Sequence, residues 1–141
     1  MLQSEILELE AFCNNELKGI AIFPYVAQRE NWDCGVACVA MVLRQQYINI
    51  RKMFPERPQK GISGYNIAKL VNSPNLVRHY KLKPIEYYCD NNNYILLTKK
   101  DKSDWGHYVV KDSYNYIYDP EVSIMPLKDY EREFVSFHIK L

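Results

Sequence analysis

The stretch QRENWDCGVACVAMVLRQQY, residues 28–47, decides the fold that the sequence predicts. Small and branched apolar residues follow Cys34 and cover most sides of a helix over residues 34–47. Asp33 stands directly before this run and is expected to serve as its N-cap, while polar residues close the far end. We therefore predict a helix that begins at Cys34 and is buried on most sides.

The rest of the N-terminal half should hold shorter helices. Residues 3–17 carry apolar side chains at loose helical spacing, and residues 20–26 are expected to be an extended lead-in to the central helix. Prolines and glycines mark a loop over residues 55–64. Ser63 can then cap another short helix, which should end before Asn72.

The C-terminal half should form an antiparallel sheet. After Pro84, short runs rich in Tyr, Ile, Val and Thr alternate with clusters of Asn, Asp, Ser and Gly, a pattern typical of strands joined by turns. The predicted strands are residues 85–89, 94–99, 107–111, 116–119 and 135–141, with a helix-like stretch over residues 127–134. Helices followed by a sheet predict an α+β fold, in which the N-terminal helices pack on the C-terminal sheet.

Length and composition exclude several classes of protein. With 141 residues the chain is expected to be one domain, residues 1–141, and its 48% hydrophobic and 25% charged residues are ordinary for a globular protein. A formal net charge of +1 gives no electrostatic footprint for nucleic acid or anionic lipid. No apolar run is long enough to cross a bilayer. We expect a soluble protein with no nucleic-acid partner and no membrane-spanning segment.

The chain has four cysteines, and they form neither a disulfide framework nor a zinc site by spacing. No pair has CxxC spacing, and the acidic N-terminal residues do not read as a secretory signal. These features favour a reducing, cytoplasmic setting. Cys13, Cys38 and Cys89 are expected to be packing residues.

Cys34 is the candidate nucleophile. It stands in the first turn of the predicted helix, where free backbone N–H groups and the helix dipole stabilise a thiolate. Gly35 leaves room for a substrate backbone to come close. The alternative is that Cys34 is a buried packing residue, and the residues that accompany it decide between the two.

A cysteine nucleophile needs a base, and His107 is the candidate. It opens the strand over residues 107–111 directly after a loop, where its side chain can reach the mouth of a cleft. Asp119 ends the next strand and returns to the same end of the hairpin if the turn is centred between Ser113 and Tyr114. Its carboxylate could then orient the imidazole and stabilise the cation.

Gln28 is the candidate oxyanion donor. It lies six residues before Cys34, where its side-chain amide can aim at the same point as the Cys34 N–H; the alternative is a solvated loop residue. The chain order Gln, Cys, His, Asp, with the Cys at a helix start and the others on a sheet, is similar to that of papain-like cysteine peptidases. Trp32 and Trp105 lie beside these segments and are expected either to wall the cleft or to pack in the core.

Two segments resemble the bacteriocin-processing cysteine peptidases, which cut leader peptides after a double glycine. Residues 28–47 are similar to the active-site segment of that family, with Gln, five residues, and then Cys-Gly before an Ala-rich helix. GHYVVKDSYNYIYDP, residues 106–120, is similar to its His-containing strand and closing Asp-Pro. The WDCG start and the MVLR run also resemble a stand-alone branch labelled guanylyl cyclase.

The resemblance implies a papain-like cysteine peptidase core. Cys34 would be the nucleophile and His107 the general base and then acid, with Asp119 as orienter and Gln28 as oxyanion donor. A peptide or protein substrate would lie extended in a cleft between the helical and sheet halves and be cut after a small, Gly-Gly-like site. The interval from His107 to Asp119 is shorter than usual in the family and implies a tighter hairpin with an even register.

Two other functions stay open at this stage. An acyltransferase of the transglutaminase type would use the same four residues, and a peptide-binding module could keep the fold without catalysis. No Gly-rich phosphate loop or paired metal-binding carboxylates support cyclase chemistry, so the sequence favours a thiol hydrolase that needs no cofactor or metal. The transporter membrane domain to which many family members are fused is not part of the 141 residues.

Overall fold

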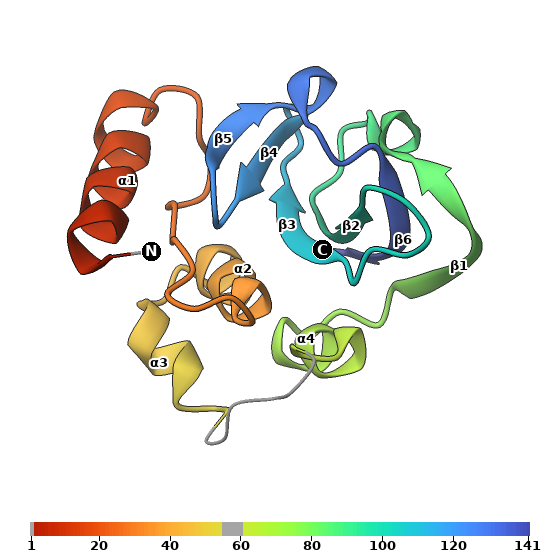
Figure 1. Ribbon diagram of the computed structural model, residues 1–141, viewed down its shortest axis with the longest axis horizontal. Coiled ribbons are helices and arrows are strands. Elements are labelled where there is room, and N and C mark those ends of the chain that lie inside the picture. The colour runs from red at the N-terminus through yellow and green to blue at the C-terminus, as the bar shows by residue number, and fades with distance from the viewer. Residues whose placement is uncertain (1, 55–60) are drawn as a thin grey trace.

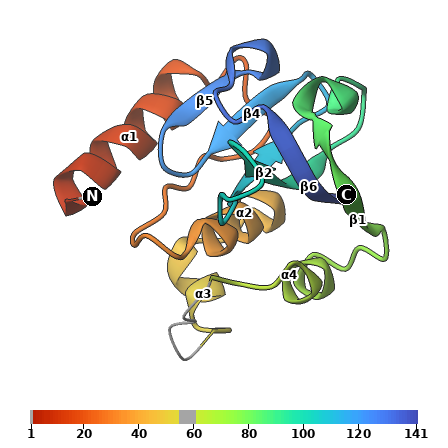
Figure 2. The same cartoon turned by 45° about the vertical axis from the view of Figure 1, so that its right-hand side comes forward.

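The computed structural model describes residues 2–54 and 61–141, and it has the α+β arrangement that the sequence predicts. Helices precede the sheet in the chain and pack against it, with α2, α3 and α4 on the same side of the sheet in both views (Figures 1 and 2). The helices are α1 (Gln3–Glu16), α2 (Cys34–Leu43), α3 (Tyr47–Arg51) and α4 (Gly64–Leu70), with 3-10 turns η1 (Ile85–Tyr88) and η2 (Leu127–Asp129). The strands are β1 (Leu76–Pro84), β2 (Tyr94–Lys99), β3 (His107–Lys111), β4 (Tyr116–Asp119), β5 (Ser123–Pro126) and β6 (Phe134–Lys140).

Helix α2 lies at the centre of the core, as its apolar run predicts. Every residue from Gly35 to Met41 is buried, and the helix packs on β3 and α3. At Gly35 a Cβ atom would lie 3.0 Å from Cδ1 of Ile67, so the absent side chain lets α2 approach α4 closely. The prediction that this helix reaches Tyr47 is wrong. Arg44 takes a left-handed conformation (φ 54°), which ends α2, and Tyr47 begins α3.

The six strands form one antiparallel sheet in the order β1-β6-β2-β3-β4-β5. One face packs on α2, and the other is covered by η1 and η2, whose Ile85, Tyr88 and Leu127 join a second apolar cluster. The predicted strands over residues 94–99, 107–111 and 116–119 are confirmed, and β6 begins one residue before the predicted start at Val135. No helix in the described part of the chain is long and apolar enough to cross a membrane.

Two further predictions of secondary structure are wrong. Residues 85–89 form the turn η1 instead of a strand, and the helix-like stretch over residues 127–134 contains only the short turn η2. Strands β1 and β5 were not predicted. Both lie at the edges of the sheet, where a strand pairs on one side only and carries little of the apolar alternation that identifies a strand in a sequence.

The pairing of β6 with its two neighbours, β1 and β2, is interrupted near Ser136. Ser136 is skipped in the pairing of β6 with β2, which makes it a bulge. Against β1 the register of β6 shifts between Arg78 and Lys83, so the ladder leaves out residues 79–82. Within that segment the side chain of Tyr80 is fully exposed. The edge strand therefore turns part of its length away from the sheet.

Candidate active site

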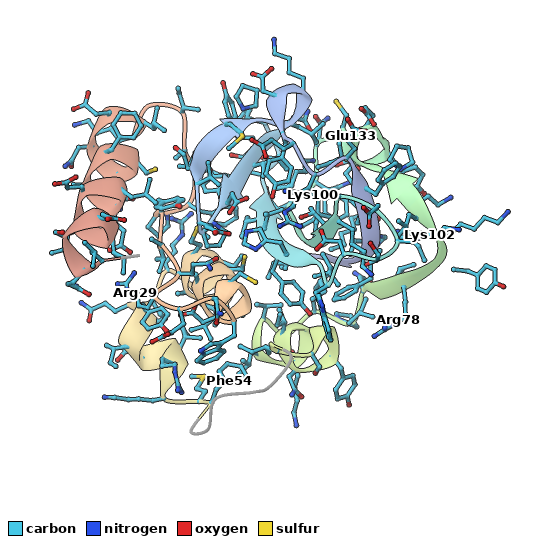
Figure 3. All side chains as sticks on the ribbon, in the orientation of Figure 1. Arg29, Phe54, Arg78, Lys100, Lys102 and Glu133 are labelled. Carbon is cyan, nitrogen blue, oxygen red and sulfur yellow. The ribbon has the colours of Figure 1, made fainter. Side chains whose placement is uncertain are left out.

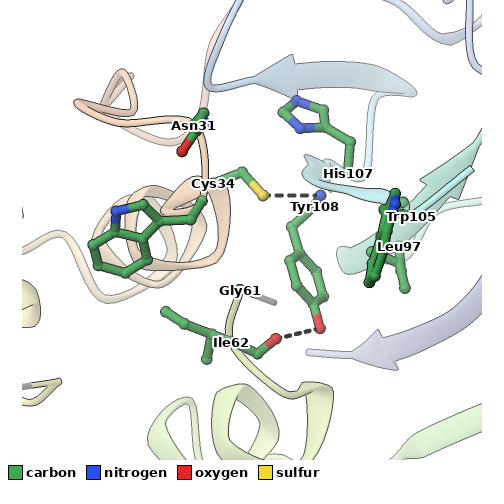
Figure 4. A pocket seen from close by; sticks show the side chains of 10 residues that line it. Asn31, Cys34, Gly61, Ile62, Leu97, Trp105, His107 and Tyr108 are labelled. Atoms are coloured by element: carbon green, nitrogen blue, oxygen red, sulfur yellow. Dashed lines mark hydrogen bonds between the residues drawn. The ribbon is translucent and has the colours of Figure 1, made fainter. Parts of the chain in front are cut away.

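Cys34 begins α2 and its sulfur faces the sheet. The thiol is half-buried, and the backbone N–H of Tyr108 donates a hydrogen bond to Sγ at 3.4 Å. Figure 4 shows the sulfur pointing from the helical side toward β3, where His107 stands beside Tyr108. The sulfur thus lies at the start of a helix and accepts a hydrogen bond from a strand amide.

His107 is the first residue of β3, and the neighbouring strand holds its backbone in place. The hydroxyl of Thr98 donates to the His107 carbonyl at 2.8 Å, and Nε2 of the ring lies 2.6 Å from Oδ1 of Asp119. Because a carboxylate can only accept, Nε2 carries a proton and Nδ1 is the nitrogen available to Cys34. The ring is buried between these two partners.

Asp119 ends β4 and is held from several sides. Its Oδ2 accepts from the Tyr130 hydroxyl at 2.7 Å, its Oδ1 accepts from the Glu121 N–H at 2.9 Å, and its carbonyl accepts from the Tyr25 hydroxyl at 2.5 Å. These contacts fix both the backbone and the carboxylate. The side chain that holds His107 therefore has little freedom of its own.

The hairpin between β3 and β4 has a slightly different centre from the predicted one. Val110 lies opposite Tyr118, which centres the turn on Tyr114 rather than between Ser113 and Tyr114. Asn115 adopts φ 65° in this turn, and the Asp112 carboxylate accepts the backbone N–H groups of Tyr114 and Tyr116. Continued outward, this register puts His107 and Asp119 on the same face as diagonal neighbours, which the predicted centre would not have done.

The pKa values of the pair move in opposite directions. Burial lowers the pKa of His107, but the hydrogen bonds and charge attraction from Asp119 and Cys34 outweigh it and raise the pKa to about 10. Burial alone would raise the pKa of Asp119, yet hydrogen bonds from His107, Tyr130 and the Glu121 N–H hold it below its usual value. At neutral pH the pair is therefore an imidazolium and a carboxylate.

Gln28, like Asp119, lies outside the cavity that Cys34 and His107 line. Its backbone N–H donates to the Pro120 carbonyl at 2.9 Å, which ties the loop before α2 to the end of β4. The side chain is buried, with Nε2 donating to the Glu30 carbonyl at 2.8 Å and Oε1 left without a partner. The amide has a second N–H group, for which the structure gives no acceptor among the described residues. The role of Gln28 as an oxyanion donor stays a prediction.

Asp33 does not cap α2 with its side chain, contrary to the prediction. The carboxylate is fully buried and turns back, accepting the backbone N–H groups of Arg29 and Glu30, each at 3.0 Å. The Tyr47 hydroxyl donates to the same carboxylate at 2.5 Å. Asp33, which directly precedes Cys34, therefore fixes the loop that follows Gln28.

A cavity of about 340 Å³ opens beside the sulfur, lined by Asn31, Trp32, Cys34, Gly61, Ile62, Leu97, Trp105, Gly106, His107 and Tyr108. Both tryptophans line it, Trp32 as a buried residue and Trp105 with 76% of its surface exposed. Gly106 adopts φ +95° and a Cβ there would lie 2.8 Å from Leu97. The Tyr108 hydroxyl donates to the Ile62 carbonyl at 2.8 Å, which joins the sheet to the segment before α4 (Figure 4).

The structure thus brings together Cys34, His107 and Asp119. Sequence reasoning missed the residues that hold them, namely Tyr25, Asp33, Thr98, Tyr108 and Tyr130. Only Asp33 carried a signal, because it stands directly before Cys34 in the sequence. Of the remaining cysteines, Cys13 and Cys38 are buried, whereas Cys89 is exposed and is not the packing residue that was predicted. Within residues 2–54 and 61–141, no group of three or more His, Cys, Asp or Glu side chains could hold a metal ion.

Comparison with known proteins finds relatives in fold. A family model described as guanylylate cyclase matches residues 23–68, a segment that includes Gln28 and Cys34 but neither His107 nor Asp119. No curated protein matches the chain. A double glycine motif protease from an AMS/PCAT transporter, solved in complex with a leader peptide, superposes with a TM-score of 0.58 and 21% identity over 85% of this chain and 91% of that chain.

A second solved structure with the same fold is the peptidase domain of Streptococcus ComA, a bi-functional ABC transporter involved in a quorum sensing pathway. Its TM-score is 0.53, with 20% identity over 82% of this chain and 94% of that chain. Both similarities that the sequence suggested, to double-glycine peptidases and to the branch labelled guanylyl cyclase, are confirmed by these matches. At these identities the structures establish the papain-like fold of the chain.

Proposed function

We propose that this protein is a cysteine peptidase whose nucleophile is Cys34. The observation that carries the proposal is His107, which is hydrogen-bonded to Asp119 through Nε2 and faces the Cys34 thiol at the mouth of a cavity. Nucleophilic catalysis by cysteine needs a thiol that contacts an imidazole, which in turn is held by a carboxylate. We also propose that residues 1–141 act as one catalytic domain.

The reaction would proceed in two steps. The Cys34 thiolate attacks the carbonyl carbon of the scissile peptide, and the oxyanion is held by the Cys34 N–H and the Gln28 amide. His107 then gives its proton to the leaving amine as the C–N bond breaks, which leaves a thioester on the sulfur. In the second step neutral His107 takes a proton from water, the hydroxide attacks the thioester, and the thiolate returns with His107 protonated.

The substrate would be a polypeptide bound in extended form and cut after small residues. The cavity supports this, because Trp32, Trp105 and Tyr108 narrow it while Gly61 and Gly106 leave their own positions without side chains. A neighbour with the same fold is a double glycine motif protease solved with a leader peptide. All four cysteines are unpaired, which fits a reducing, cytoplasmic compartment.

Thiol labelling tests the proposal within a single molecule, because Cys89 is an internal control. Cys89 is exposed and no hydrogen bond joins it to a histidine in the described residues, whereas Cys34 is half-buried beside His107. With iodoacetamide near neutral pH, we expect Cys34 to react at least about tenfold faster than Cys89, as followed by peptide mass spectrometry. His107→Ala should remove this difference and leave the Cys89 rate unchanged. Equal rates in the wild-type protein would contradict an activated thiol.

A second assay separates hydrolysis from acyl transfer, the alternative that uses the same residues. Peptides with Gly-Gly centres are incubated with the protein, with and without an added primary amine. Release of a free carboxylate in both cases identifies a peptidase, and incorporation of the amine identifies a transferase. Binding without turnover, unaffected by Cys34→Ala, would identify a peptide-binding module.

A further inference from the structure

Three lysines surround a second hollow, at the irregular edge of the sheet. A cavity of about 320 Å³ is lined by Tyr80, Lys81, Leu82, Lys99 and Lys102. Its far wall is the part of β1 that the ladder leaves out, and its near wall is the end of β2 with the loop that follows. Figure 3 shows Lys102 and Arg78 on the β1 side of the molecule, away from α1.

The acidic side chains of the adjoining loop contact partners other than these lysines. The Asp101 carboxylate accepts the hydroxyl and N–H of Ser103, and Asp104 pairs with Arg132 and accepts the Lys100 N–H. In the part of the chain that the structure describes, no ion pair involves Lys81, Lys99 or Lys102. Three lysines thus line one hollow, and none of them forms an ion pair with a described residue.

The hollow adjoins the candidate active site through a single short loop. Lys102 lies three residues before Trp105, which lines the cavity beside Cys34, so at most about 10 Å of chain separates the two positions. Asp104 fixes this loop through Arg132 and through the Gly106 N–H. A polypeptide that lies in the cavity beside Cys34 and continues past Trp105 would reach the lysines within a few residues.

We propose that the hollow formed by Lys81, Lys99 and Lys102 is a subsite for acidic side chains of the polypeptide substrate. The inference rests on the proposed function in naming a substrate polypeptide as the occupant. Carboxylates carry the charge that complements three lysines, and Leu82 provides apolar surface for the stems of Glu side chains. A nucleic acid is disfavoured by the net charge of +1 and the sequence pI of about 7.6.

Binding of matched peptides tests this subsite without requiring turnover. The probes are a fluorescein-labelled peptide with a Gly-Gly centre flanked by Glu residues and its counterpart with Gln, measured by fluorescence anisotropy on the Cys34→Ala protein. Lys81→Gln/Lys102→Gln should weaken binding of the Glu peptide by about 3- to 10-fold and leave the Gln peptide unchanged. Lys18→Gln/Lys128→Gln removes the same charge at two exposed positions away from the hollow and should change neither.

Three results would overturn the proposal. They are an absence of preference for the Glu peptide, an equal loss in both double variants, and tighter binding of a labelled single-stranded oligonucleotide that Lys81→Gln/Lys102→Gln abolishes. Failure of the peptidase proposal would look different. In that case the wild-type protein would bind the Glu peptide through the lysines but neither cleave it nor label rapidly at Cys34.

Discussion

At His107, burial and charge act in opposite directions on one imidazole, and the charges prevail. A raised pKa means that the ring keeps its proton from neutral pH up to about 10, so the group that we propose to protonate the leaving amine is present throughout that range. We expect kcat/KM to fall on the alkaline side as pH passes about 10, rather than near the ordinary histidine value of about 6.5. A pH profile of peptide cleavage measures this limb directly.

Asp119→Asn is the matched variant for that profile. The amide keeps the shape of the side chain but removes the charge, so the alkaline limb should move to lower pH and kcat should fall by about 10²- to 10⁴-fold. KM should change little, because Asp119 is buried behind His107 and does not line the cavity. An unchanged limb and rate would remove Asp119 from the mechanism.

Asp33 shows how one buried carboxylate can order a loop beside a nucleophile. Asp33→Asn would replace one of the two acceptor oxygens by an NH2 donor, which would face either the Arg29 N–H or the Glu30 N–H. We expect the free energy of unfolding to drop by about 1–3 kcal/mol, as measured with urea, and kcat to fall because the Gln28 loop loses its anchor. Tyr47→Phe removes one of the three hydrogen bonds and is the milder control. Stability loss without any change in kcat would show that the loop is not needed for catalysis.

At the scale of elements, α4 and β6 meet at a glycine. A Cβ on Gly64 would lie 2.2 Å from Cζ of Phe137, and Phe137 in turn packs edge-on against Tyr108. Gly64→Ala should therefore destabilise the protein by about 1–3 kcal/mol in urea denaturation. Gly19→Ala is the matched control, because nothing lies within 4 Å of its Cβ position. Equal stabilities would mean that α4 can shift away without cost.

Strands β1 and β6 are also joined through a tyrosine between two histidines. The Tyr88 hydroxyl lies 2.5 Å from Nε2 of His79 and 2.7 Å from Nδ1 of His138. Burial is the main cause that lowers the pKa of both rings. The positive charge of Lys83 lowers the pKa of His79 further. At His138, His79 and Lys140 lower the pKa further and Asp90 raises it. The stability that neutral rings contribute is present above the unfolded value of about 6.5 and is lost as pH falls below it.

The three histidines of the chain allow this to be measured directly by NMR titration. We expect two imidazoles, His79 and His138, to titrate below about 6.5, and His107 to titrate far above it. His107 contributes stability that is fully present below about 6.5 and is lost as pH rises toward about 10, whereas His79 and His138 lose theirs below about 6.5. Single His→Gln variants therefore assign the curves and separate the effects. Three curves clustered near the ordinary value would contradict both networks.

The sequence predicted elements well where pattern and burial coincide. The apolar run after Cys34 and the strand His107–Lys111, all of whose residues are buried, were both predicted. It failed where a conformation depends on distant partners. Strand β1 forms by pairing with β6 at the edge of the sheet. Helix α2 ends because Arg44 adopts a left-handed conformation, which cannot be predicted from the type of its side chain. The contacts of Tyr25 and Tyr130 with Asp119 span 94 and 11 positions and left no local signal.

At the scale of the whole molecule, the reactivity of the four cysteines can measure unfolding, because they differ in exposure. Cys13 and Cys38 are fully buried, Cys34 is half-buried and Cys89 is exposed. We expect the native protein to present Cys34 and Cys89 to N-ethylmaleimide, and Cys13 and Cys38 to react only as the protein unfolds. Mass spectrometry across a urea series measures both sets, and the second should follow the cooperative loss of circular dichroism. Early reaction of Cys38 would show that α2 opens locally.

The hydrogen bond from the Tyr108 N–H to the Cys34 sulfur joins residues 74 positions apart. During synthesis Cys34 leaves the ribosome long before β3 exists, so the thiol emerges without its imidazole and without the strand amide that faces it. The proposed reactivity of Cys34 can arise only after β3 has been made and has docked against α2. A nascent or truncated chain therefore carries an ordinary cysteine, and the proposed chemistry is confined to molecules that have finished folding.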